Sequence, residues 1–195
     1  TVFVVCYRLR SVRQERMPSE GAALVLCNHQ SFYDPPLVGL AFHRQLNFLA
    51  RENLLRGIWG RVLVLLNSIP VDREGMGFGG LKETLRRLQA GNMVLIFPEG
   101  ERSRSGEVLP IKPGFSALAK RAGVPLIPMA IDGAFEVWPR GQPLPWPVGR
   151  IALYFGEPIL PEEISQYDQR GLVAEVERRI RDCHAEARRL VRECR

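Results

Sequence analysis

The feature that most constrains the fold is a series of short apolar runs separated by longer segments with helical periodicity. Short apolar runs are typical of strands buried on both faces, and strands that alternate with helices favour a largely parallel sheet. The clearest runs are 22–28 (AALVLCN) and 93–98 (MVLIFP), and others lie at 46–50, 68–72, 124–131 and 151–155. Because 124–131 contains two prolines, we expect it at a sheet edge or in an irregular position.

Helices are expected between these runs. Asp34 is the predicted N-cap of a helix over 34–41, because two prolines follow it and suit a first turn. Residues 81–90 and 115–121 have helical patterns that end before a glycine. Residues 172–194 place apolar side chains on one stripe of a long amphipathic helix. The segment 53–66, which carries Trp59, is interpreted as a helix or as a membrane-facing segment.

The length of 195 residues is enough for one domain with a substantial core. The prediction is a single α/β domain over 1–195, with a mostly parallel mixed sheet flanked by helices. Its motif-bearing core covers about 9–160, and its C-terminal amphipathic helix covers about 171–194. In such sheets, ligands bind beyond the carboxyl ends of the strands, so polar residues that follow the apolar runs should share one rim.

The net charge of +6 suits an anionic membrane, a phosphorylated substrate or nucleic acid, and equally an ordinary solvated surface. No nucleic-acid motif is present, so we expect no nucleic-acid partner. The four cysteines lack C-x-x-C spacing and the three histidines lack ligand spacing, which argues against a metal site. Reduced cysteines predict a cytosolic or cytosol-facing location.

No run approaches the ~20 apolar residues of a membrane span. The segment 2–6 (VFVVC) is either the end of a removed membrane segment or a first strand.

The first chemical motif is 28–34 (NHQSFYD). Histidine is the natural base near neutral pH, and a carboxylate on its far nitrogen fixes the tautomer. His29 and Asp34 are candidates for such a pair, and they can meet only if the chain turns between them. The alternative is a surface histidine beside an N-cap aspartate.

The second motif is 97–103 (FPEGERS). Arg102 can bind a phosphate through two N–H groups, and Gly100 lets the backbone approach a ligand closely. Glu99 can hold the arginine or a substrate hydroxyl. Arg73, in the third motif 68–74 (SIPVDRE), is a second candidate phosphate ligand. The alternatives are a solvated turn with a weak ion pair and an ordinary charged loop.

These motifs, followed by V-P-L-I-P at 124–128 and G-E-P-I at 156–159, resemble in order the motifs of the 1-acylglycerol-3-phosphate acyltransferase family. The resemblance runs from about Leu9 to Ile159. It implies an acyltransferase fold in which His29 is the general base and Asp34 its partner. It also implies that Arg73, Glu99, Gly100 and Arg102 bind the glycerol phosphate of the acceptor.

The reaction implied by the resemblance moves a fatty acyl group from acyl-CoA or acyl-carrier protein to the free hydroxyl of 1-acylglycerol-3-phosphate, giving phosphatidate. It needs no cofactor, no metal and no acyl-enzyme intermediate. Two departures concern the acceptor. Glu101 stands where the family usually has threonine and would repel an anion unless it turns outward. Arg51 replaces a frequent lysine and remains a candidate phosphate ligand, as does Lys112.

The expected partners are therefore a lysophospholipid, an acyl donor and a membrane surface. We expect the protein at the cytoplasmic face of the membrane, either peripheral or anchored by a segment missing from this chain. Tryptophans with nearby arginines in 137–150 suit a headgroup boundary, although the loop can equally be plain surface.

Three other functions remain open. The acceptor can be glycerol-3-phosphate or another lysolipid such as a lyso-aminolipid. A non-catalytic basic lipid-binding module is a more distant alternative. A hydrolase is disfavoured, because the sequence contains no G-x-S-x-G nucleophile motif.

Overall fold

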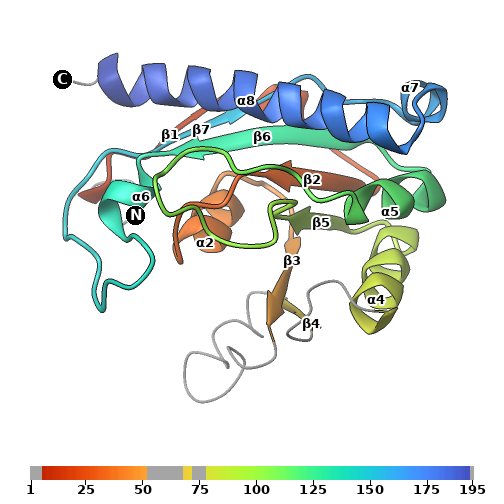
Figure 1. Ribbon diagram of the computed structural model, residues 1–195, viewed down its shortest axis with the longest axis horizontal. Helices are drawn as coiled ribbons and strands as arrows, with labels where there is room; N and C mark the ends of the chain where they lie inside the picture. Colours follow the sequence, from red (N-terminus) through yellow and green to blue (C-terminus); the bar gives the residue numbers. More distant parts are fainter. Residues whose placement is uncertain (1–5, 52–67, 72–77, 194–195) are drawn as a thin grey trace.

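The computed structural model describes residues 6–51, 68–71 and 78–193, and within them one seven-stranded sheet forms the centre of the molecule (Figure 1). The strand order is β1-β7-β6-β2-β5-β3-β4. All neighbouring strands are parallel except β6 and β7, which confirms the predicted largely parallel sheet. The strands are β1 Arg10–Val12, β2 Ala23–Cys27, β3 Leu46–Arg51, β4 Ser68–Val71, β5 Met93–Ile96, β6 Leu126–Asp132 and β7 Ala152–Phe155.

Helices cover both faces of this sheet. They are α2 Asp34–Leu40, α4 Phe78–Gln89, α5 Gly114–Ala122, α6 Ala134–Val137, α7 Pro161–Gln166 and α8 Gln169–Glu193, with a short 3-10 helix at Gln14–Arg16. Alternate strand residues supply two cores. Leu24 and Leu26 of β2 pack with α4, α5 and α8, whereas Val25 and Cys27 pack with α2 and α6. This alternation is what a strand buried on both faces requires.

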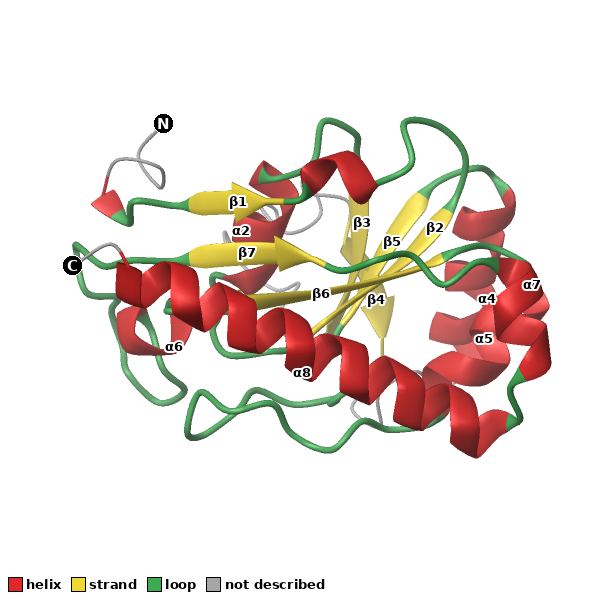
Figure 2. Cartoon of the chain, turned by 90° about the horizontal axis from the view of Figure 1, so that it is seen from above, coloured by secondary structure: helices red, strands yellow, loops and turns green. Residues whose placement is uncertain are grey.

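The long C-terminal helix is confirmed. Helix α8 buries Leu172, Val176 and Ile180 along one stripe and lies across β6 and β7 (Figure 2). Its outer face carries arginine–carboxylate pairs at helical spacing, such as Arg178 with Glu175. Helix α4 begins at Phe78, three residues before the predicted start at 81, and the short helices α6 and α7 were not predicted.

Of the two positions predicted for 124–131, the sheet edge is wrong, because β6 lies between β2 and β7 and is buried throughout, whereas irregular pairing is found at Pro128. Pro128 is tolerated there because its missing N–H falls where the β6–β7 ladder is interrupted. On that side Pro128 O accepts from Gly156 N at 2.8 Å, between the bridge of Leu126 with Ile159 and the paired residues Met129 and Phe155. A proline costs a strand little where no partner carbonyl faces its nitrogen.

Several predictions fall on parts of the chain outside the described residues, namely residues 2–5, the segment 53–66 and Arg73. Within the described part, no helix has both the length and the apolar character needed to cross a membrane. Cys6, Cys27 and Cys183 are free thiols.

The carboxyl ends of β2, β5 and β6 lie at one rim of the sheet, because these strands are adjacent and parallel. The residues that follow them are 28–34, 97–103 and 133–137. The fold thereby brings the first two motifs next to each other.

Candidate active site

The loop between β2 and α2 is fixed at its start by Asn28. The buried Asn28 side chain donates from Nδ2 to Ile131 O at 3.0 Å, and its Oδ1 accepts from Ile131 N at 2.8 Å. Asn28 therefore continues the β2–β6 pairing by one residue, and it sets the point at which the chain leaves the sheet.

His29 and Asp34 meet after that point. His29 Nδ1 lies 2.7 Å from Asp34 Oδ2, and the same oxygen accepts from the backbone N–H of Gln30 at 2.6 Å and of Ser31 at 2.7 Å. Asp34 is fully buried, and it is the first helical residue of α2 rather than the predicted N-cap, which is Tyr33. Three donors converge on one carboxylate oxygen, as expected for an ionised aspartate that folds the loop around itself.

The ring of His29 is held on its other side by Phe97. The two rings are stacked, with centroids 4.0 Å apart and planes 16° from parallel. The side chain of His29 is 19% exposed, so it reaches the surface at the rim. Because Nδ1 faces the carboxylate, it carries the proton of the neutral ring, and the lone pair is on Nε2.

Two hydrogen bonds made by the backbone of His29 join the two motifs. Ser103 N donates to His29 O at 2.7 Å, and His29 N donates to Glu99 Oε1 at 3.1 Å. The loop after β5 therefore holds both the N–H and the C=O group of His29.

Glu99 is only 2% exposed, and this burial raises its pKa to about 8. The N–H groups of His29 and Leu109 oppose the shift, whereas the charge of Asp34 adds to it. A carboxyl with this pKa is mostly protonated at neutral pH. The structure therefore places Glu99 behind His29 as a largely neutral group.

Gly100 adopts a left-handed backbone conformation with φ of +75°. A Cβ at this position would lie 2.8 Å from Lys112 Nζ, so the ammonium group of Lys112 lies directly over Gly100. The Lys112 backbone is fixed by a hydrogen bond from its N–H to Pro98 O at 2.9 Å. Glycine is required here both by the backbone conformation and by the close approach of the lysine.

Arg102 lies over the ring of Phe32, with 3.5 Å between its guanidinium carbon and the ring centroid. This cation–π contact holds a positive charge beside the histidine motif. Arg102 and Lys112 are thus two cationic side chains at the rim, and both were candidates from the sequence.

Glu101 turns away from this cationic rim. Its Oε2 lies 3.2 Å from Arg140 Nη1, and both side chains are exposed. The repulsion expected from a carboxylate at this position is thereby reduced, because the charge is directed to the loop after α6 and is paired there.

The side-chain positions of two candidate phosphate ligands are not described by the structure. Arg73 lies outside the described residues, and Arg51 is the last residue of β3 with a side chain that is not described. Among the described residues, no group of three or more His, Cys, Asp or Glu side chains is arranged to hold a metal ion.

A buried polar cluster behind the loop was not predicted from the sequence. Gln30 donates from Nε2 to Gly106 O at 2.6 Å and lies 3.2 Å from His184 Nε2 of α8. His184 in turn pairs with Asp132 at 3.0 Å, and both are buried. Two features of the sequence could have indicated this cluster. They are a polar residue beside the apolar stripe of α8 and an aspartate at the carboxyl end of β6. The cluster packs the loop against α8.

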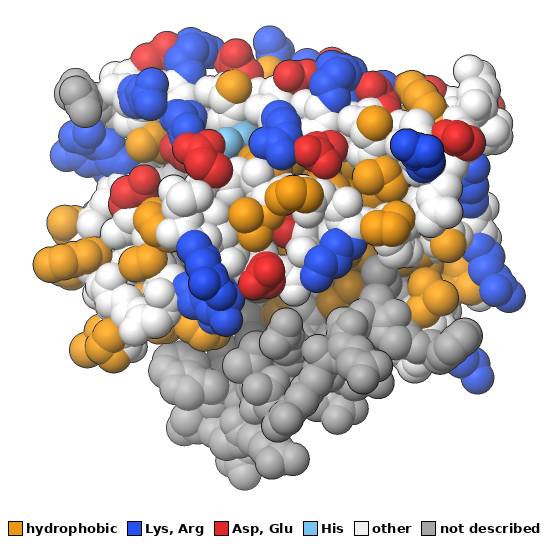
Figure 3. Space-filling view, in the orientation of Figure 1, with side chains coloured by type: hydrophobic (Ala, Val, Ile, Leu, Met, Phe, Trp, Pro, Cys, Tyr) orange, Lys and Arg blue, Asp and Glu red, His pale blue; other side chains and the backbone are white. Residues whose placement is uncertain are grey.

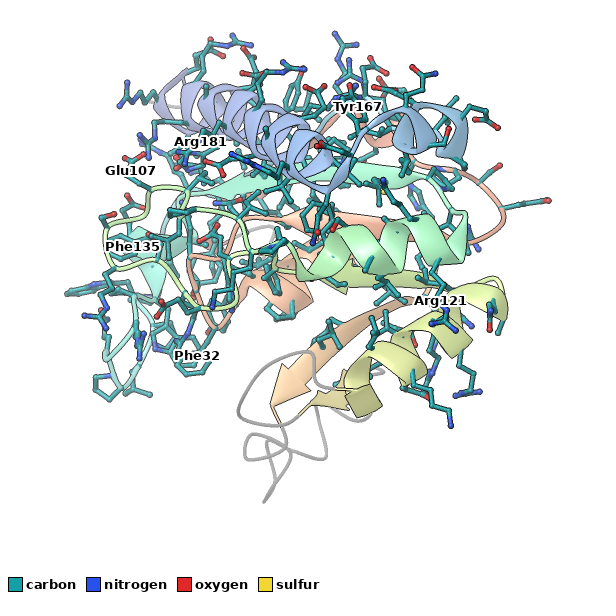
Figure 4. All side chains as sticks on the ribbon, turned by 45° about the vertical axis from the view of Figure 1, so that its right-hand side comes forward. Phe32, Glu107, Arg121, Phe135, Tyr167 and Arg181 are labelled. Carbon is teal, nitrogen blue, oxygen red and sulfur yellow. The ribbon has the colours of Figure 1, made fainter. Side chains whose placement is uncertain are left out.

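A hollow of about 610 Å³ lies on the outside of this cluster, between α8 and the 107–108 segment, where Figure 4 shows Glu107 and Arg181 close together. Its arginines are largely paired already, for example Arg188 with Glu107 at 2.8 Å and Arg181 with Glu177 at 2.7 Å. We therefore assign the chemistry to the rim around His29 and not to this hollow.

A family model described as "Acyltransferase" matches residues 8–132 of the chain. The 1-acyl-sn-glycerol-3-phosphate acyltransferase of Bacillus subtilis (strain 168) is 30% identical over 148 residues, which are 75% of this chain and 71% of that protein. The protein of the same name from Cocos nucifera is 31% identical over 62% of this chain, but the match spans only 40% of its own length. The crystal structure of the 1-acyl-sn-glycerophosphate (LPA) acyltransferase PlsC from Thermotoga maritima is similar with a TM-score of 0.79 and 27% identity, over 91% of this chain and 71% of that one.

Proposed function

The chain belongs to the acyltransferase family, and on this premise we propose that it transfers a fatty acyl group from an acyl thioester to the free hydroxyl of 1-acylglycerol-3-phosphate. The product is phosphatidate, and the donor is acyl-CoA or acyl-carrier protein. The names of the relatives support the reaction, since the Bacillus, Cocos and Thermotoga proteins are all named for it.

The contact of His29 with Asp34 is the observation that carries the mechanism. In the proposed step, His29 Nε2 takes the proton of the acceptor hydroxyl as its oxygen attacks the thioester carbonyl carbon. Asp34 holds the ring in the required tautomer and stabilises the imidazolium through the 2.7 Å contact at Nδ1. When the tetrahedral intermediate collapses, the C–S bond breaks, and the proton passes from Nε2 to the departing thiolate.

The acceptor phosphate is assigned to the cationic rim. Arg102 and Lys112 lie beside the histidine motif, and Arg51 and Arg73 are further candidates from the sequence. The proposed contribution of Gly100 is the close approach of its backbone, and that of Glu99 is to position the backbone of His29. No step requires a metal, a cofactor or a covalent enzyme intermediate.

A transfer assay with purified protein, oleoyl-CoA and a panel of lyso acceptors tests this function. We expect His29→Ala to remove nearly all transfer while the circular dichroism spectrum stays that of the wild type. A preference for glycerol-3-phosphate or for a lyso-aminolipid would replace the proposed acceptor. Unchanged transfer by His29→Ala would contradict the proposed role of His29 as general base.

The acceptor is a membrane lipid, so we further propose that the protein works at the cytoplasmic face of a membrane. The free thiols and the net charge of +6 support this location.

A further inference from the structure

The loop that joins α6 to β7, residues 138–151, exposes large apolar side chains. Leu144 is 74% exposed, Trp146 61% and Val148 69%. Figure 3 shows apolar side chains gathered at the lower left of the molecule, where Figure 1 places this loop. Burying such side chains is favourable, so a cluster of them at a loop tip indicates a surface with a binding partner.

The loop is held in place by its own hydrogen bonds. Tyr7 donates from its hydroxyl to Trp146 O at 3.0 Å, and Trp146 N donates to Val137 O at 2.9 Å. The indole N–H of Trp138 donates to Gln142 O at 2.9 Å. The backbone at Trp146 is therefore fixed, and the exposed side chains are presented by an ordered loop.

The same loop forms a wall of the candidate active site. Ser31 donates from Oγ to Trp138 O at 2.9 Å, and the Trp138 ring packs on Phe32 with centroids 5.3 Å apart. Arg140 reaches Glu101 of the second motif. Phe32, itself 40% exposed, lies at the end of the molecule remote from Tyr167 and Arg121 (Figure 4). The apolar tip and the rim with His29 thus belong to one edge of the protein.

We propose that the tip 144–148, together with Phe32, inserts into the headgroup boundary of an anionic bilayer and thereby seats the active site on the surface that supplies its lipid acceptor. The identity of the acceptor rests on the proposed function. Arg150 follows the tip, and Arg140, which pairs with Glu101, precedes it. Arginine beside tryptophan suits a boundary where apolar side chains enter and cations meet phosphate. A second copy of the chain is a poorer occupant, because two molecules of net charge +6 repel each other.

Vesicle flotation tests the surface without turnover. The double variant Leu144→Ser with Trp146→Ser should bind vesicles of phosphatidylcholine and phosphatidylglycerol roughly tenfold more weakly or worse, because two large apolar groups are lost. Leu160→Ser is the matched control. Leu160 is 54% exposed, but it precedes α7 at the opposite end of the molecule (Figure 1), and its removal should leave binding unchanged.

Quenching of tryptophan emission by brominated lipid locates the contact even if another part of the chain also binds. The variant Trp146→Phe keeps an apolar ring at the tip, so the protein should still float with the vesicles. Its emission should lose most of the quenching seen in the wild type, because the inserted indole is gone. Wild-type flotation by the double variant, with full quenching in Trp146→Phe, would overturn the proposal. A dimer that the double variant abolishes would assign the tip to a second copy instead.

Activity separates this inference from the proposed function. The double variant should lose transfer to acceptor held in vesicles while it keeps transfer to the same acceptor in detergent micelles. If even the wild type shows no transfer in micelles, the proposed function fails, although vesicle binding can still stand. If transfer is normal but the double variant matches the wild type on vesicles, only the proposal that the tip inserts into the membrane fails.

Discussion

Replacement of Glu99 by glutamine should make the protein less sensitive to rising pH. Burial raises the pKa of Glu99 in the folded protein to about 8, against an ordinary value of 4.5. Between these two values the unfolded chain has released the proton that the folded protein retains. Folding must therefore take up a proton there, and the free energy of unfolding falls as the pH rises from 4.5 towards 8.

The size of the effect follows from the gap between the two pKa values. At pH 7, the uptake of this proton on folding lowers the free energy of unfolding by roughly 3 kcal/mol. At pH 5 it lowers the free energy of unfolding by less than about 1 kcal/mol. Glutamine has the shape of the protonated side chain and keeps an oxygen that can accept from His29 N. Glu99→Gln should therefore gain roughly 2–3 kcal/mol over the wild type between pH 5 and pH 7.

Urea unfolding of both proteins, followed by circular dichroism at several pH values between 5 and 9, measures this difference. Glu101→Gln is the control, because it removes an exposed carboxylate only two residues away. Parallel stability curves for the wild type and Glu99→Gln would show that Glu99 ionises normally in the folded protein, and they would refute the raised pKa of Glu99.

The remaining predictions concern single side chains. Asp34→Asn should lower kcat on the order of 10³–10⁴-fold with a small change in KM, because the ring loses its tautomer and its counter-charge; an intact kcat in steady-state assays would contradict this. Arg102→Ala should raise the acceptor KM roughly tenfold or more and leave the donor KM unchanged, since a charge-assisted contact is lost; an unaltered acceptor KM would show that the phosphate binds elsewhere. Asp132→Asn should destabilise the protein by about 1–3 kcal/mol at pH 7. Burial raises the pKa of Asp132, but the hydrogen bond from His184 and the nearby positive charges outweigh it and lower the pKa below 3.8. The stabilisation by Asp132 is therefore present above pH 3.8 and lost as the pH falls through the depressed pKa, so unfolding curves of the two proteins should converge in acid.

The sheet and the main chemical pair could be predicted from local sequence. Runs such as 93–98 are apolar throughout, as is typical of a strand buried on both faces. His29 and Asp34 are five residues apart, so a single turn of chain brings them together. Both features are local, and the short separation along the chain already limits the conformations that these residues can adopt.

Contacts between distant segments could not be predicted in the same way. The neutral state of Glu99 depends on the packing of three segments around it, and the outward turn of Glu101 depends on Arg140 in another loop. The proline of β6 misled for the same reason, because its position is tolerated only through a break in pairing with β7. Each outcome is set by tertiary contacts that have no periodic signature in the sequence.

The pairing of β1 with β7 has a consequence for the order of folding. Arg10 is paired in register with Ala152, and its backbone N donates to Ile151 O at 3.0 Å, although most of the chain separates them. During synthesis β1 cannot complete its ladder until the last strand has left the ribosome, since β7 is its neighbour in the sheet. Residues 10–12 are thus among the last parts of the sheet to be paired. A chaperone or a membrane has that whole interval in which to engage the exposed edge of the nascent protein.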